Sequence, residues 1–194
     1  MNVQGKNRQG GLINMAAFLP KSVVNGPGLR AVVWVQGCPR RCQGCFNQDM
    51  LEFKDNQVVS AEELASSILA IQGINGVTFS GGEPFAQADS IAELAEYLAI
   101  QGLTITIFTG YTYQELKAAA NPGWNRLLAV ADLLVAGPYV KERPSNEYLL
   151  GSANQELIFL TDRLREHPDF TKNAGHAREF SIDAAGNIVI SGLG

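Results

Sequence analysis

The sequence predicts an α/β fold with mostly parallel strands, because short apolar runs alternate with amphipathic helical segments along most of the chain. Residues 31–35 form a continuous β-branched and aromatic run without polar alternation, which is typical of a strand that is covered on both faces. Helical patterns separate the later apolar runs, so consecutive strands would pair in parallel through right-handed crossovers. We therefore expect an open sheet or a partial (β/α) barrel built from about four or five strand–helix units.

The composition indicates a single globular domain of a cytoplasmic protein. The chain has 194 residues, of which 46% are hydrophobic, and this is enough for a substantial core. A net charge of -4 argues against binding to nucleic acid or to an anionic membrane surface. No apolar run approaches the roughly 20 residues that span a bilayer, and the polar start lacks the apolar segment of a signal peptide. We expect residues 1–11 to form a flexible arm and residues 12–194 to form one domain.

The first half of the chain carries clear local signals for its elements. Residues 12–19 suit a short strand, and the turn sequence at 25–28 would reverse the chain before the strand at 31–35. Ser60 and Glu63 have the spacing of a capping box, which would begin a helix that ends near Gly73.

Strands and helices continue to alternate in the second half. A strand at 76–80 precedes a helix that Ser90 and Glu93 would cap, and a strand at 103–108 precedes a helix that Thr112 and Glu115 would cap. The latter helix should end before Asn121, and a further strand covers 132–136. After Pro144 the alternation weakens. The expected elements at the end are the two arms of a β-hairpin, at 180–182 and 188–190, around a turn at 184–187.

All three cysteines of the chain, Cys38, Cys42 and Cys45, lie in one CxxxCxxC segment. Three thiols cannot form a closed set of disulfides, and they are one ligand short of a four-cysteine metal site. The segment directly follows the buried strand at 31–35. In α/β folds, active sites are built at this carboxyl end of the strands.

Three cysteines in one loop could serve a zinc site, a redox pair or an iron–sulfur cluster. A zinc site would need a histidine, and His167 and His176 are distant in sequence; a redox pair would leave Cys38 without a role. An iron–sulfur cluster with one open iron fits three ligands and is favoured. Arg40 and Arg41 would then either offset part of the cluster's negative charge or remain solvated loop residues.

A second motif, Gly81-Gly82-Glu83-Pro84, follows the strand at 76–80 and should lie at the same sheet edge as the cysteines. Two glycines let the backbone approach a ligand closely, and exposed peptide groups there can bind a charged amino-acid moiety. Alone, the tetrapeptide would be an ordinary turn between strand and helix. Because it lies one strand–helix unit after the cysteine motif, the tetrapeptide indicates a ligand-binding loop much more specifically.

Together these motifs resemble the radical S-adenosylmethionine (radical SAM) superfamily. The cysteines match its cluster-binding motif, and the Gly-Gly-Glu-Pro segment matches the motif that contacts the amino group of the cofactor. Segments 25–30, 37–47, 109–112 and 151–155 are similar, more narrowly, to the activating enzymes of glycyl radical enzymes, in particular those that activate anaerobic ribonucleotide reductase. Ala136 departs from the aspartate that these reductase activases tend to carry at this point.

The resemblance implies a partial (β/α) barrel of the radical SAM type that holds one 4Fe-4S cluster and S-adenosylmethionine. It implies reductive cleavage of S-adenosylmethionine and formation of a glycyl radical on a partner, most simply the large anaerobic ribonucleotide reductase subunit, with a flavodoxin or ferredoxin type electron donor. Cys38, Cys42 and Cys45 would bind the cluster. The residues expected to contact S-adenosylmethionine are Gly44, Cys45, Phe46, Gly81, Gly82, Glu83 and Thr109.

Two other functions remain open from the sequence. One is a radical SAM enzyme that acts on a small molecule, although a chain of 194 residues leaves little room to enclose such a substrate. The other is a non-catalytic metal-binding or partner-binding module that carries the same cysteine loop. Cleavage of S-adenosylmethionine would separate the enzymes from the module, and a glycine-centred radical on a reductase would separate the two enzymes.

Overall fold

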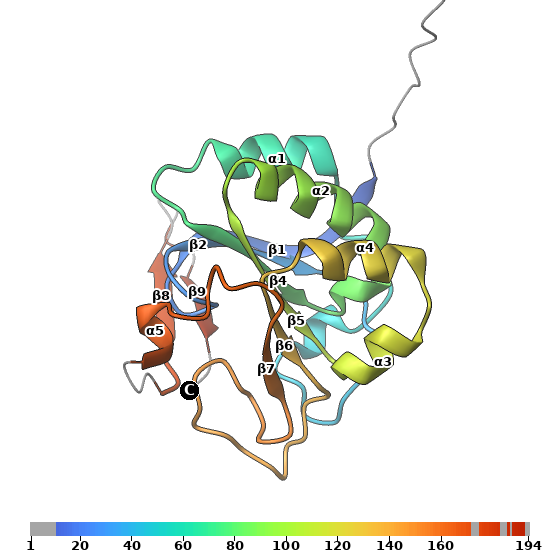
Figure 1. The fold of residues 1–194 in the computed structure, drawn as a ribbon, viewed down its shortest axis with the longest axis vertical. Helices are drawn as coiled ribbons and strands as arrows, with labels where there is room; N and C mark the ends of the chain where they lie inside the picture. Colours follow the sequence, from blue (N-terminus) through green and yellow to red (C-terminus); the bar gives the residue numbers. More distant parts are fainter. Residues whose placement is uncertain (1–10, 172–174, 183–185, 187, 193–194) are drawn as a thin grey trace, which may run out of the picture.

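The computed structural model describes residues 11–171, 175–182, 186 and 188–192 (Figure 1). The arm expected at residues 1–11 lies outside the described residues except for Gly11. Among the described residues, none of the helices combines the length and the apolar character that crossing a bilayer requires.

A seven-stranded sheet in the order β3-β1-β2-β4-β5-β6-β7 forms the centre of the fold (Figure 1). The four inner strands from β2 to β6 are parallel, whereas β1, β3 and β7 are joined to their neighbours by antiparallel pairing. The mostly parallel α/β fold is thus confirmed. A barrel is not, because the sheet is open with β3 and β7 as its edges. The strands are β1 (Leu12–Ser22), β2 (Arg30–Val35), β3 (Gln57–Ser60), β4 (Gly76–Gly81), β5 (Thr104–Thr109), β6 (Leu133–Ala136) and β7 (Glu156–Phe159).

Two of the three predicted capping boxes begin helices in the structure. Ser60 caps α1 and Thr112 caps α3, each accepting a hydrogen bond from the backbone of the glutamate three residues later, whose side chain accepts in return. The box predicted at Ser90 is wrong, because a 3-10 turn, η2, leads directly into α2 and makes Gln87 the residue before the helix. The helices are α1 (Ala61–Leu69), α2 (Ala88–Ile100), α3 (Tyr113–Ala118), α4 (Pro122–Val130) and α5 (Pro168–Thr171), with 3-10 turns η1 (Gln48–Met50) and η2 (Pro84–Gln87).

The sequence reasoning missed α4 and the two edge strands β3 and β7. Asn121 was expected to follow a helix, and it does, but its side chain also accepts a hydrogen bond from Trp124 N and caps α4. Pro122 at the first helical position has no N–H to leave unpaired, so a second helix can begin shortly after α3 has ended at Ala118.

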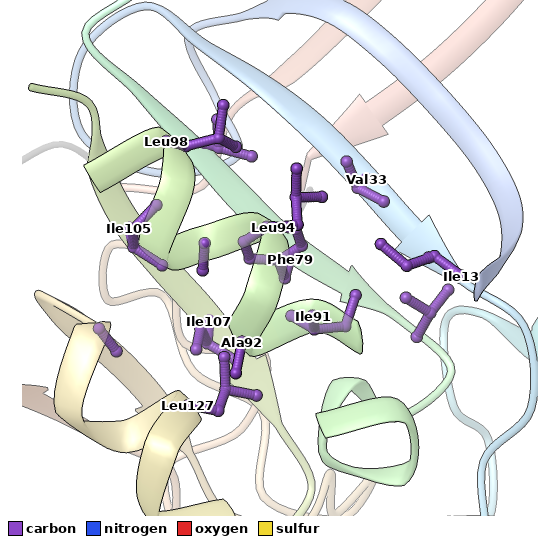
Figure 2. Packing of buried hydrophobic residues seen from close by; sticks show 14 of the residues in the cluster. Ile13, Val33, Phe79, Ile91, Ala92, Leu94, Leu98, Ile105, Ile107 and Leu127 are labelled. Carbon is purple, nitrogen blue, oxygen red and sulfur yellow. The ribbon is translucent and has the colours of Figure 1, made fainter. Parts of the chain in front are cut away.

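Helices cover one face of the sheet, and the main core lies between them and the strands (Figures 1 and 2). Figure 2 shows Leu94 of α2 near Phe79 of β4, and Ile107 of β5 near Leu127 of α4. Strand side chains alternate between faces, so Val32 and Trp34 belong to a second cluster on the opposite face. All six residues of β2 are buried, as expected for a strand covered on both sides.

The opposite face is covered by the chain after β6. Leu133 and Val135 pack there with Leu149, Leu150 and Leu164. The predicted C-terminal hairpin is also present: β8 (Arg178–Ile182) pairs antiparallel with β9 (Ile188–Gly192) as a separate two-stranded sheet. Of the turn predicted at 184–187, only Gly186 is among the described residues.

Candidate active site

The carboxyl ends of the parallel strands meet at one edge of the sheet. Val35 of β2 is the register partner of Gly81 of β4, and Thr109 of β5 is the partner of Ala136 of β6. The cysteine loop begins after β2 and the Gly-Gly-Glu-Pro loop after β4, so both predicted motifs lie at this edge. It is the edge at which parallel α/β sheets build their ligand sites.

Backbone hydrogen bonds hold the start of the cysteine loop on two sides. Gly37 N donates to Met50 O at 2.9 Å, and Cys38 N donates to Leu51 O at 3.0 Å, so the loop closes back on the residues of and after η1. On the other side, Glu83 N donates to Gly37 O at 2.9 Å. The first cysteine is therefore fixed relative to the neighbouring loop by main-chain groups.

The two glycines allow the Gly-Gly-Glu-Pro loop to pack directly on the cysteine loop. A Cβ atom on Gly82 would overlap the carbonyl oxygen of Gly37, and one on Gly81 would lie 2.6 Å from Val35 N. Gly81 also has a φ of +100°, a conformation that other residues rarely adopt. A side chain at Gly82 would therefore force the two loops apart, and one at Gly81 would clash with the end of β2.

A pocket of about 430 Å³ lies beside these loops, and all three cysteines line it. The predicted residues Phe46, Gly81, Gly82 and Thr109 line it as well. Gly44 and Glu83 are not among its lining residues. Instead, Gly44 packs beside Lys141, whose Cδ would be 3.0 Å from a Cβ on this glycine.

Glu83 is completely buried, and its carboxylate is bound by protein donors. Thr109 Oγ1 and Phe85 N donate to Oε1 at 2.9 and 3.1 Å, and Gly110 N donates to Oε2 at 2.8 Å. Burial raises the pKa of Glu83 to about 7, although these three donors act in the opposite direction. Its side chain thus holds the loop after β5 against the loop after β4.

Arg40 lines the pocket, and protein groups hold its side chain. Its guanidinium donates to Glu115 Oε1 of α3 at 2.9 Å and lies 4.9 Å from the centre of the Tyr111 ring. The arginines of this loop were expected either to offset charge on the cluster or to remain solvated. Because protein groups hold the Arg40 side chain, it is not simply a solvated loop residue. Arg41, by contrast, is exposed and has a φ of +45°.

The three thiols are free, and their environments differ. Cys38 is buried, whereas Cys42 and Cys45 are half-buried; burial raises the pKa of Cys38 and that of Cys45. Among the described residues, no three Cys, His, Asp or Glu side chains are arranged to hold one metal ion. A four-iron cluster makes a different demand, because each thiolate binds a different iron.

The histidines that a zinc site would need lie elsewhere. Neither His167 nor His176 is among the residues that line the pocket. His176 Nε2 is 2.8 Å from Leu150 O, and His167 Nδ1 accepts a hydrogen bond from Asp169 N at 3.3 Å. The structure thus brings the cysteines together with the glycine loop and not with a histidine.

Two polar residues of the pocket were not predicted as site residues. Asn47 donates to Gly81 O at 3.0 Å and so joins the cysteine loop to the glycine loop. Gln155 accepts a hydrogen bond from Gly151 N and donates to Gly137 O, which ties the segment 151–155 to the end of β6. The resemblance of 151–155 to the reductase activases was the only sequence signal for Gln155.

Ala136, where the reductase activases tend to carry an aspartate, is buried in the core on the helix side of the sheet and does not line the pocket.

Comparison with known proteins agrees with these features. Residues 24–158 match a family model described as a 4Fe-4S single cluster domain. The anaerobic ribonucleoside-triphosphate reductase-activating protein of enterobacteria phage T4 is 30% identical over 162 residues, covering 80% of this chain and 99% of that protein. The protein of the same name from Vibrio cholerae is 31% identical over 155 residues, covering 75% of this chain and 97% of that protein.

An activating enzyme with a different name is similar over a shorter segment. The pyruvate formate-lyase-activating enzyme of Clostridium pasteurianum is 37% identical over 97 residues, which are 47% of this chain and 41% of that enzyme. The chain therefore belongs to the 4Fe-4S family of the anaerobic ribonucleoside-triphosphate reductase-activating proteins, among the glycyl radical enzyme activases of the radical SAM superfamily.

Proposed function

We propose that Cys38, Cys42 and Cys45 hold a single 4Fe-4S cluster, and that S-adenosylmethionine binds between this cluster and the glycine loop. The protein would use them to install a glycyl radical on the large subunit of anaerobic ribonucleotide reductase. One observation carries the proposal: cysteines from a single loop share a pocket of about 430 Å³ with Gly81 and Gly82 of the neighbouring strand end.

The residues present fit both groups. Three thiolates leave one iron of a cubane cluster without a protein ligand, and the amino and carboxylate groups of S-adenosylmethionine can fill that place. The backbone at Gly81 and Gly82 can come close to the amino-acid part of the cofactor because no side chain intervenes. Phe46 and Thr109 complete the contacts that we assign among the pocket residues, and Gly44 lies in the loop beside them.

Glu83 has a positioning part in this proposal. Its carboxylate already accepts three hydrogen bonds from Thr109, Phe85 and Gly110, so it would act on the cofactor through the loop after β5. Thr109 both lines the pocket and donates to Glu83, and this makes it the link between the buried carboxylate and the cofactor site.

When bound, the reduced cluster would supply an electron for cleavage of S-adenosylmethionine, and the cleavage product would take a hydrogen atom from the partner's glycine. The chain itself orients the cofactor and excludes solvent with apolar side chains such as Trp34, Phe108 and Tyr139, which also line the pocket. A glycine suits the reaction because a backbone without a side chain can enter a narrow site.

The names of the relatives favour a protein substrate over a small molecule. Two of them are named as activating proteins of anaerobic ribonucleoside-triphosphate reductase and a third as the activating enzyme of pyruvate formate-lyase. We further propose a cytoplasmic location and a flavodoxin or ferredoxin type electron donor. Three free thiols at one site support the location, because reducing compartments keep thiols available for cluster binding.

The test is anaerobic reconstitution with iron and sulfide, followed by incubation with S-adenosylmethionine and dithionite. We expect 5'-deoxyadenosine to form and, when the reductase large subunit is present, a glycine-centred paramagnetic signal on that subunit. Absence of 5'-deoxyadenosine would exclude both enzymatic functions and leave the binding module. Cleavage without a radical on any glycyl radical enzyme would favour a small-molecule substrate.

A further inference from the structure

The C-terminal hairpin presents an apolar face of four large side chains, Phe180, Ile182, Ile188 and Ile190, which we call the hairpin face. Phe180 is paired with Ile190 and Ile182 with Ile188 across the two strands. The exposed fraction is 65% for Phe180, 70% for Ile182, 62% for Ile188 and 59% for Ile190. Adjoining exposed apolar side chains of this size mark a surface that another molecule covers.

The other face of the hairpin is attached to the body of the protein. Asn25 Nδ2 donates to Ser191 Oγ at 3.0 Å, and Val23 N donates to Glu179 Oε2 at 3.4 Å. Because alternate residues of a strand point to opposite sides, the hairpin face lies on the side opposite to Glu179 and Ser191.

The hairpin is also part of the wall of the active-site pocket. Arg178 of β8 and residues 189–192 of β9 line the same pocket as the three cysteines. Ile190 belongs both to this wall and to the hairpin face, so the apolar surface is continuous with the pocket. The hairpin follows residues 24–158, the part of the chain that the family model matches.

We propose that the hairpin face is the docking surface for the glycyl radical enzyme, which lays an apolar segment across it while its glycine enters the pocket. This inference rests on the proposed function, because that function requires a polypeptide to reach the cysteines. A polypeptide that enters the pocket along the β9 wall meets Ile190 and its neighbours first. A second copy of this chain on the same face would cover that entrance.

The decisive variant is Phe180→Thr combined with Ile182→Thr. Neither residue lines the pocket, and threonine keeps a preference for strands while it removes most of the apolar surface. With the cluster-loaded protein, we expect affinity for the anaerobic ribonucleotide reductase large subunit to fall at least about tenfold, as for loss of about 1.4 kcal/mol. Glycyl radical yield should fall at low reductase concentration and recover at saturation. Formation of 5'-deoxyadenosine without reductase should stay unchanged.

Two controls accompany the variant. Phe180→Leu with Ile182→Val keeps the face apolar and should bind the reductase almost as well as the wild-type protein. Ile100→Thr removes an isoleucine that is 80% exposed at the end of α2, outside the pocket lining, and should leave the affinity unchanged.

Other results would overturn the docking proposal. These are unchanged reductase affinity in the double threonine variant, equal loss in the Leu/Val variant, or loss of 5'-deoxyadenosine formation along with binding. A wild-type dimer that dissociates in the threonine variant while reductase affinity is kept would show that the face joins two copies of this chain. If the wild-type protein cleaves S-adenosylmethionine but neither binds nor modifies the reductase, the proposed partner itself is wrong.

Discussion

Thr109 Oγ1 donates a hydrogen bond to Glu83 Oε1 at 2.9 Å, across 26 positions of sequence. Both side chains are buried, and they connect the ends of β4 and β5 beside the pocket. Removing the donor of a buried acceptor costs more free energy of folding than the hydrogen bond contributes, because water cannot replace the donor at a buried site. This pair therefore controls how the glycine loop and the loop after β5 are aligned.

Replacing Thr109 with valine should destabilise the protein by about 1–3 kcal/mol, because Glu83 loses a donor in a dry site. The free energy of unfolding from urea titration measures the effect. Thr109→Ser keeps the hydroxyl and should lose less. Equal stability of the valine variant and the wild-type protein would show that the bond does not contribute.

The stability of the cluster-free protein should depend on the ionisation of Glu83. Burial raises its pKa from 4.5 to about 7, so the folded protein holds a proton that the unfolded chain has released. This contribution is fully present below pH 4.5 and is lost as the pH rises to about 7. Glu83→Gln cannot titrate and should lack this decline in the free energy of unfolding. Parallel pH profiles for variant and wild type would contradict the assignment.

Gly82→Ala should push the glycine loop off the cysteine loop, because the new methyl group overlaps Gly37 O. Overpacking of this kind costs about 1–3 kcal/mol, and binding of S-adenosylmethionine should weaken as well. Calorimetry with the reconstituted protein measures both. Gly175→Ala is the matched control, since the atom nearest to its Cβ would be Asn146 O at 3.6 Å. If the two variants behave alike, the close contact is unimportant.

Cys42→Ala should abolish assembly of the 4Fe-4S cluster, because two thiolates at Cys38 and Cys45 cannot hold three of its irons. The iron–sulfur absorption spectrum after anaerobic reconstitution reports the outcome. Gln43→Ala, in the same loop and exposed, is the control that should load normally. An intact spectrum in the cysteine variant would refute the ligand assignment.

Arg40→Gln should lower the reduction potential of the bound cluster. The substitution removes a positive charge from the pocket wall and breaks the contacts with Glu115 and Tyr111 that hold the loop. Anaerobic redox titration measures the potential, and Arg41→Gln at the exposed neighbouring position should change it less. A larger effect at Arg41 would assign the electrostatic part to the other arginine.

Helices whose first turn carries its own capping signal were predicted well. Elements whose ends depend on contacts with distant parts of the chain were not. The boxes at Ser60 and Thr112 need only residues within one helical turn, and both exist. The box at Ser90 failed because η2 starts α2 earlier, and Glu93 instead accepts a hydrogen bond from Gly11 N, 82 residues away. The edge strands β3 and β7 are short, and pairing with β1 and β6 establishes them.

By itself, the sequence determined that all three cysteines lie in one segment, that strands and helices alternate through most of the chain, and that two motifs follow neighbouring strands. These follow from residue types and short spacings, which act within a few positions of the chain. Only the tertiary structure decided that the carboxylate of Glu83 is directed to Thr109 and Gly110, that Arg40 is held by Glu115, and that the C-terminal hairpin forms part of the pocket wall. Such contacts join residues 26 to more than 100 positions apart, and sheet register and loop packing bring them together.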